Sequence, residues 1–312
     1  MDDRIYDSVL DLIGRTPIVR LKRLSPSKGG EVLGKLENLN PAGSVKDRPA
    51  LQMILDAEAR GEIGAGATII EATSGNTGIS LAMIAAVRGY QCVLVMPEDM
   101  SVARRQILQS YGAEVVLTPP EEGMAGAVER AEALLAETKN AIMPRQFSNP
   151  SNPDAHAKTT AEEIWRATGG KLDAFVAGVG TGGTLSGVAR VLKQRHPALH
   201  VVAVEPRGSA VLSGGKPGLH GIQGLGAGFV PDTLDLTVVD KVELVTNEES
   251  IEMARRLARE EGILAGISCG AAAAAAVRLA KQPENAGKNI VVILPDSGER
   301  YLTSVLYEGL FD

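Results

Sequence analysis

The sequence predicts an α/β protein whose parallel sheets are covered by helices on both faces. Short apolar runs rich in Val and Ile alternate with segments of helical periodicity along most of the 312 residues, and this alternation is typical of such folds. A hydrophobic fraction of 44% and a charged fraction of 22% are those of a globular protein with a large core. The predicted buried strands are residues 68–71, 92–96, 114–117, 174–177, 200–204 and 289–294.

Two segments show the clearest helical periodicity. Residues 49–60 carry apolar side chains three or four positions apart and end at Gly61. Residues 251–261 repeat the pattern, and Thr246 and Glu249 before them have the spacing of a capping box. Domain boundaries are expected where turn-forming residues interrupt both periods, near residues 147–154 and again near 38–43.

Charge and composition exclude several classes of function. A net charge of −6 argues against a general binder of nucleic acids or anionic membranes. The chain shows no secretory signal and no apolar stretch long enough to span a bilayer. Cys92 and Cys269 form no disulfide framework, and His196, His200 and His220 lack the spacing of metal ligands. We therefore expect a cytoplasmic protein without a metal site.

A glycine-rich loop follows the predicted strand at residues 174–177 and opens a helix. The exposed N–H groups and the dipole at such a helix start attract anions, and glycines let a phosphate approach the backbone. A GxGxxG pattern with Glu205 at the end of the next strand also leaves a nicotinamide dinucleotide open, and tight packing is a third interpretation. The loop residues are Gly180, Thr181, Gly182, Gly183 and Thr184.

Lys46 lies in a turn, residues 40–48, that leads into the predicted helix at 49–60. A helix N-terminus and partial burial would lower the pKa of this lysine and favour a neutral, nucleophilic amine. The alternative is an ordinary solvated lysine on the surface. It is not a P-loop lysine, because the GxxxxGK spacing is absent.

A polar loop follows the predicted strand at residues 68–71 and also opens a helix. Its hydroxyl, amide and N–H donors would suit a carboxylate, although one or more of its residues could simply cap the helix. The residues are Thr73, Ser74, Asn76 and Thr77.

Taken together, these motifs resemble the cysteine synthase (O-acetylserine sulfhydrylase) family, which has the tryptophan-synthase-β-like fold of pyridoxal-phosphate enzymes. The resemblance covers nearly the whole chain, and residues 221–231 resemble the A type of the family. It implies two open, twisted, mostly parallel sheets flanked by helices, with the cofactor in a cleft between a smaller mobile domain and a larger one. The implied domains are a substrate-loop domain at 40–149 and a cofactor-phosphate domain at 12–39 plus 150–312. The motifs are IGRTP, NPAGSVKDR, TSGNTG, QFSNPSNPDAH, GTGGT, GISCGA and LPDSGERYL.

The resemblance also assigns roles to individual residues. Lys46 resembles the lysine that binds the cofactor as a Schiff base, Asn76 the partner of its phenolic oxygen, and Ser268 the partner of its pyridine nitrogen. The glycine loop 180–184 resembles the phosphate site. The substrate-carboxylate site is implied at Thr73, Ser74, Asn76, Thr77 and Gln146.

The implied reaction is a pyridoxal 5'-phosphate-dependent β-replacement. O-acetyl-L-serine and sulfide give L-cysteine and acetate through an α-aminoacrylate intermediate. Cystathionine β-synthase and a phosphoserine sulfhydrylase remain as alternatives, and a nicotinamide-dependent oxidoreductase is the rival of another class. The resemblance further implies a homodimer and a possible complex with the C-terminal tail of serine acetyltransferase. We expect His156 to make a structural hydrogen bond and Cys269 to fill a small buried space.

Overall fold

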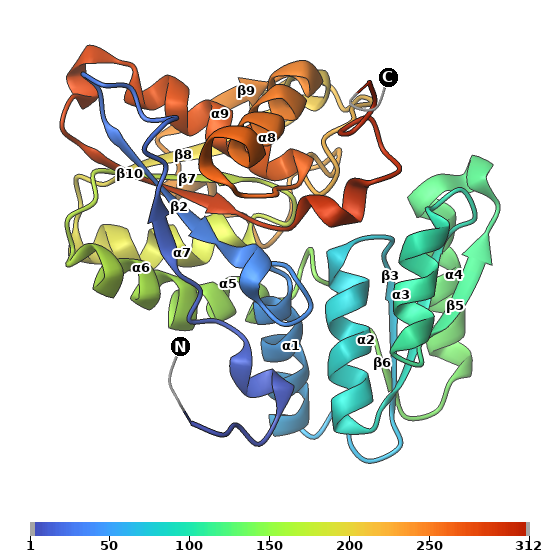
Figure 1. The fold of residues 1–312 in the computed structure, drawn as a ribbon. Coiled ribbons are helices and arrows are strands. Elements are labelled where there is room, and N and C mark those ends of the chain that lie inside the picture. Colours follow the sequence, from blue (N-terminus) through green and yellow to red (C-terminus); the bar gives the residue numbers. More distant parts are fainter. Residues whose placement is uncertain (1–3, 310–312) are drawn as a thin grey trace. The chain divides into compact units, whose positions relative to one another are not determined.

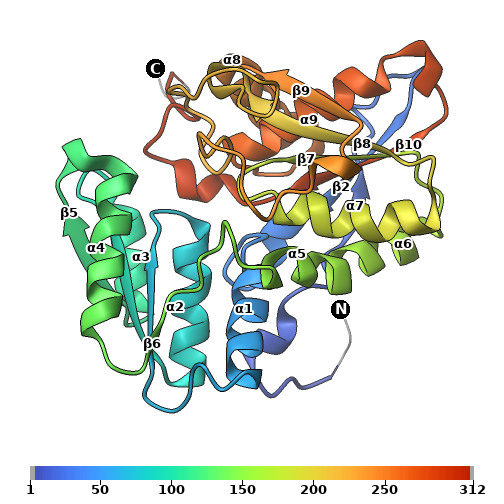
Figure 2. The same ribbon diagram turned by 180° about the vertical axis from the view of Figure 1, so that it is seen from behind.

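The computed structural model describes residues 4–309, which form two compact units (Figures 1 and 2). The first unit contains residues up to Ile13 and residues 40–152, and the second contains residues 14–39 and those from Pro153 onward. Each unit has one sheet with helices on both faces, so the predicted α/β class with two mostly parallel sheets is confirmed. No helix in the described part of the chain is both long and apolar enough to cross a bilayer.

The first unit has a four-stranded sheet in the order β5-β4-β3-β6, and all its strands are parallel. Apolar residues of α1, α2 and α3 pack on one face with alternate residues of β3 and β4, and α4 packs on the other face. The strands are β3 (Thr68–Ala72), β4 (Gln91–Pro97), β5 (Glu114–Thr118) and β6 (Ala141–Ile142), and the helices are α1 (Asp47–Ala59), α2 (Asn76–Arg88), α3 (Val102–Ser110) and α4 (Gly123–Glu137).

The second unit has a six-stranded sheet in the order β1-β2-β10-β7-β8-β9, parallel except for the antiparallel edge pair β1–β2. Helices α8 and α9 cover one face, and α6 and α7 cover the other (Figure 1). The strands are β1 (Ile18–Arg20), β2 (Glu31–Leu36), β7 (Ala174–Gly178), β8 (His200–Pro206), β9 (Lys241–Val245) and β10 (Asn289–Leu294). The helices are α5 (Ser151–Ala155), a π-helical turn (His156–Thr160), α6 (Ala161–Thr168), α7 (Gly183–Arg195), α8 (Asn247–Glu261) and α9 (Ile267–Ala280).

Short 3-10 turns connect these elements. They are Val9–Leu12, Glu37–Leu39, Pro120–Glu122, Arg207–Ser209, Leu236–Val238, Pro283–Asn285 and Gly298–Tyr301.

The six predicted strands are all present, but one prediction about burial was wrong. Residues 114–117 were expected to be buried, whereas β5 lies at the edge of its sheet and all four of these residues are exposed or half-buried. An edge strand has one neighbour rather than two, so apolar residues there remain partly in contact with water. The capping box at Thr246 and Glu249 is formed, with both reciprocal hydrogen bonds.

Candidate active site

Lys46 is the residue that precedes α1, as its motif predicted, and a buried aspartate fixes the turn around it. The Asp47 carboxylate accepts hydrogen bonds from the backbone N–H of Ala42 at 2.7 Å and from the hydroxyl of Ser80 in α2 at 2.6 Å. Gly43 has a φ of 78°, a left-handed conformation that glycine adopts without strain. The backbone that carries the Lys46 side chain is therefore held in place at the N-terminus of α1, which is the positive end of the helix dipole.

The polar loop lies between β3 and α2, and its last hydroxyl reaches a distant amide. The Thr77 hydroxyl donates to Oε1 of Gln146 at 2.6 Å, so the structure brings together two predicted substrate residues that are 69 positions apart. The residue before α2 is Gly75, and no side chain caps this helix, so the capping interpretation of the loop was wrong. Arg104 of α3, which no sequence motif marked as a site residue, donates from Nη1 to the carbonyl of Ser74 at 2.8 Å.

The glycine loop connects β7 to α7, and two of its glycines, Gly180 and Gly182, have no room for a side chain. A Cβ added at Gly180 would lie 2.2 Å from the carbonyl oxygen of Gly224, and Gly182 has a φ of 82° as it opens the helix. The carbonyl of Thr181 is held by the hydroxyl of Thr233 at 2.5 Å. The N-cap residue of α7 has no side chain that could occupy the N–H groups at the helix start, which is what a phosphate site there requires, and the role of the loop stays a prediction.

His156 links this loop to the π-helical turn. The imidazole is 1% exposed, with Nδ1 2.9 Å from the hydroxyl of Thr160 and Nε2 3.2 Å from the hydroxyl of Thr184. The predicted structural hydrogen bond is therefore present, and its partner is a residue of the predicted phosphate site.

Glu205 lies at the end of β8, where a dinucleotide-binding protein would hold ribose. Its carboxylate instead accepts hydrogen bonds from the N–H groups of Leu212 and Ser213 at 2.8 and 2.9 Å and from the Ser213 hydroxyl at 2.6 Å. A carboxylate whose two oxygens are already bonded within the chain is a poor partner for a ribose hydroxyl. This geometry argues against the nicotinamide dinucleotide alternative.

Ser268 is buried in the first turn of α9, which begins after Gly266. A Cβ at Gly266 would lie 2.1 Å from Oδ1 of Asp296, so the carboxylate is packed directly against the helix start. Tyr301 donates its hydroxyl to Oδ2 of Asp296 at 2.5 Å. Cys269 is fully buried, and burial raises the pKa of its thiol well above the ordinary value, which disfavours the nucleophilic thiolate and agrees with the expected packing role.

The predicted residues therefore fall into two sets. Lys46, the polar loop and Gln146 belong to the first unit, whereas the glycine loop and Ser268 belong to the second. Sequence reasoning missed Asp47 and Arg104, since an acid in a first helical turn and an arginine on a helix are too common to select.

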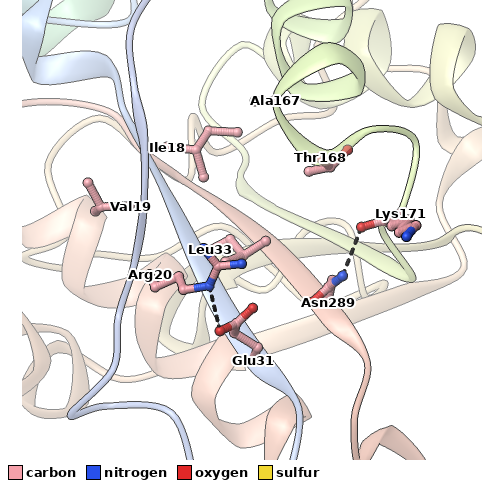
Figure 3. A pocket seen from close by; sticks show the side chains of 9 residues that line it. All are labelled: Ile18, Val19, Arg20, Glu31, Leu33, Ala167, Thr168, Lys171 and Asn289. Atoms are coloured by element: carbon pink, nitrogen blue, oxygen red, sulfur yellow. Dashed lines mark hydrogen bonds and ion pairs between the residues drawn. The ribbon is translucent and has the colours of Figure 1, made fainter.

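A separate pocket of about 220 Å³ lies in the second unit beside β1, β2 and the end of α6 (Figure 3). Its polar groups are bonded to each other. Arg20 Nε donates to Glu31 at 2.8 Å, and Asn289 Nδ2 donates to the carbonyl of Lys171 at 2.9 Å. None of the predicted site residues lines this pocket, and we assign it no part in the chemistry.

Comparison with known proteins places the chain in a family. A model of the family described as pyridoxal-phosphate dependent enzyme matches residues 9–296. A cysteine synthase of Staphylococcus aureus (strain Mu50 / ATCC 700699) is 52% identical over 308 residues, which cover 98% of this chain and 99% of that protein. The crystal structure of a cysteine synthase (OASS) from Entamoeba histolytica has a TM-score of 0.95 at 44% identity, covering 98% of this chain and 92% of the other. An O-acetylserine dependent cystathionine beta-synthase from Helicobacter pylori has a TM-score of 0.91 at 40% identity, covering 97% and 99%. The chain therefore belongs to the pyridoxal-phosphate-dependent enzymes, in the family that contains the cysteine synthases.

Proposed function

We propose that this enzyme makes L-cysteine and acetate from O-acetyl-L-serine and sulfide, with pyridoxal 5'-phosphate bound to Lys46. The observation that carries the proposal is the rigid turn that holds Lys46 at the start of α1 beside the polar loop of α2, joined through the Asp47–Ser80 hydrogen bond. The relatives named above support the same reaction.

The side chains and backbone groups of the chain fit this cofactor. The start of α7 offers N–H donors without obstructing Cβ atoms, and Thr184 adds a hydroxyl that His156 holds, which suits the phosphate. The buried hydroxyl of Ser268 suits the pyridine nitrogen, and the amide of Asn76 suits the phenolic oxygen. When bound, the cofactor supplies the electron sink for negative charge at the substrate's Cα.

The protein's own groups then bind the substrate and move its protons. The hydroxyls of Thr73 and Ser74, the N–H groups at the start of α2 and Nε2 of Gln146 would bind the substrate carboxylate. The Thr77 hydroxyl, which donates to Oε1 of Gln146, would orient that amide, and Thr77 would offer the substrate its N–H. The Lys46 amine would take the proton from Cα and later return one.

Ser268 sets the strength of the electron sink. A hydroxyl can hydrogen-bond a ring nitrogen, but it cannot hold that nitrogen protonated as a carboxylate would. The resulting moderate sink favours prompt loss of the β-substituent over racemisation.

Replacement of Lys46 by alanine tests the proposal. We expect the purified wild type to be yellow, to fix the mass of the cofactor on the peptide containing Lys46 after borohydride treatment, and to form cysteine from O-acetylserine and sulfide. K46A should show neither the colour nor the fixed mass and should form cysteine several orders of magnitude more slowly. K22A, which changes an exposed lysine of the second unit, should keep all three properties. A K46A variant with full activity and no loss of cofactor binding contradicts the proposal. Cystathionine formed when homocysteine replaces sulfide would indicate a cystathionine β-synthase. Cysteine formed when O-phosphoserine replaces O-acetylserine would indicate a phosphoserine sulfhydrylase.

Several finer features belong to the same proposal. We assign substrate binding to residues 40–149 and binding of the cofactor phosphate to residues 12–39 plus 150–312. We also propose a cytoplasmic homodimer that binds the C-terminal tail of serine acetyltransferase. Sedimentation equilibrium tests the dimer, and competition between O-acetylserine and a synthetic tail peptide tests the complex.

A further inference from the structure

Glu71 is a buried acid in a strand whose other residues carry no charge. Its side chain is 5% exposed in β3, and every residue of that strand is buried. Removing a carboxylate from water is unfavourable unless hydrogen bonds or charges compensate. The Glu71 carboxylate accepts a hydrogen bond from the backbone N–H of Arg145 at 2.8 Å. Burial nevertheless raises the pKa of Glu71 to about 7, with the Arg145 N–H and guanidinium opposing that rise.

The backbone at Arg145 has an unusual conformation. Its φ is 55°, in the left-handed region that residues other than glycine seldom occupy. The guanidinium is half-exposed and pairs with Glu132 of α4 at 2.6 and 2.9 Å. Exposed ion pairs contribute little, so this pair is a weak reason for a strained backbone. The N–H groups of Ser148 and Asn149 hold the Arg145 carbonyl, each at 3.0 Å, and the buried Glu71 carboxylate is the acceptor that holds its N–H.

The residue after Arg145 is Gln146, which we place in the substrate-carboxylate site. Gln146 is 7% exposed, its carbonyl accepts from Nδ2 of Asn152 at 2.8 Å, and its Oε1 accepts from the Thr77 hydroxyl at 2.6 Å. With Oε1 occupied by Thr77, the Nε2 hydrogens of Gln146 are the donors left for a substrate carboxylate. The orientation of this amide thus depends on the backbone that begins at Arg145.

We propose that Glu71 is a positioning residue for the substrate: by holding the Arg145 backbone in its left-handed conformation, it sets the Gln146 amide against Thr77. This inference rests on the proposed function, because the substrate carboxylate is the ligand that Gln146 is assigned to bind. A hydrophobic side chain at position 71 would fill the same space in the core, yet it would leave the Arg145 N–H without its acceptor. The acid therefore has a role that packing alone does not explain.

Two variants of Glu71 separate the effect of its hydrogen-bond acceptor from the effect of its side-chain volume. Glu71→Gln keeps an oxygen that can accept from Arg145, whereas Glu71→Met has a similar length and no such acceptor. We expect Glu71→Met to raise the KM for O-acetylserine about tenfold with kcat changed by no more than about twofold, and Glu71→Gln to restore a KM near that of the wild type. Glu132→Gln, which removes only the exposed ion pair, is the matched control and should leave both constants unchanged.

A readout that does not depend on catalysis accompanies the kinetics. In protein labelled with 15N-glutamine and free of substrate, the side-chain amide signal of Gln146, assigned through Gln146→Glu, should shift in Glu71→Met and stay in place in Glu71→Gln. The Arg145 amide of the wild type should be protected from hydrogen exchange, a measurement that needs no variant to fold. The proposal is overturned by a wild-type KM and an unmoved Gln146 signal in folded Glu71→Met, or by exchange of the Arg145 amide at the solvent rate.

These results are distinguishable from failure of the proposed function. If the wild type forms no cysteine, the proposed function fails, while the Gln146 signal and the Arg145 exchange rate still test the positioning role. If cysteine forms and Lys46 carries the cofactor but the Glu71 variants behave alike, only the positioning role fails.

Discussion

Replacement of Glu71 by glutamine should make the stability of the protein less sensitive to a rise in pH from acidic to neutral values. In the folded protein, burial raises the pKa of this carboxyl from its ordinary value of 4.5 to about 7. The hydrogen bond from the Arg145 N–H and the charge of the Arg145 guanidinium lower the pKa, and the charge of Glu132 raises it slightly. A carboxyl with a raised pKa holds its proton in the folded state after the unfolded chain has released it. The folded state is therefore favoured below pH 4.5 and loses that advantage as the pH rises to about 7.

The size of the effect follows from the two pKa values. At about 1.4 kcal/mol per pH unit, the interval from 4.5 to about 7 corresponds to about 3 kcal/mol, most of which falls within an accessible range of pH. Glutamine has no charge to desolvate, so the stability difference, Glu71→Gln minus wild type, should grow by roughly 2 to 3 kcal/mol between about pH 5 and about pH 8.5. Urea unfolding at a series of pH values, on cofactor-loaded protein, measures this difference. Parallel pH profiles for the two proteins would refute the reasoning.

Three further predictions concern the packing. Lys35 is fully buried and pairs with Glu163 at 2.6 Å, so K35M should cost roughly 3 kcal/mol in urea unfolding, and K35M/E163Q should cost less than the sum of the single losses; additive losses would exclude the coupling. A Cβ at Gly270 would lie 1.9 Å from a backbone oxygen of α8, so G270A should lower the stability by about 1–3 kcal/mol, whereas G64A, with open space around it, should be neutral in the same thermal scans. Burial raises the pKa of the Cys92 thiol to about 12, so it should react with Ellman's reagent at the rate of unfolding, and immediate labelling of native protein would contradict this.

The elements that the sequence predicted are those whose residues carry their own signal. Five strands inside the two sheets, β3, β4, β7, β8 and β10, consist mainly of apolar residues, so they were recognisable. The strands that were missed contain charges or are very short. Lys35 interrupts β2 and would suggest an exposed segment, yet it is buried because Glu163, 128 residues away, neutralises it. Such compensation becomes visible only after the chain has folded.

The same distinction applies to the site. Family, fold and cofactor were predicted from motifs at the starts of helices, and the comparisons confirm them. The roles of individual residues stay predictions. A single sequence does not show which distant residue is the hydrogen-bond partner of each site residue. The pairs Asp47–Ser80, Thr184–His156 and Thr77–Gln146 are separated by 33, 28 and 69 positions.

Helix α9 has a further consequence for how this protein can evolve. Of its 14 residues, only Ala274 and Arg278 are not buried, and its middle is a run of alanines enclosed by α8 and the sheet. A helix with neighbours on nearly every side and side chains of a single methyl group has almost no alternative position along or around its axis. Its first turn carries Ser268, so the position of that hydroxyl depends on how the whole helix is packed. Under the role proposed for Ser268, substitutions two or three turns along α9 should shift this hydroxyl and so change the electronic spectrum of the bound cofactor, although they replace no residue proposed to contact it.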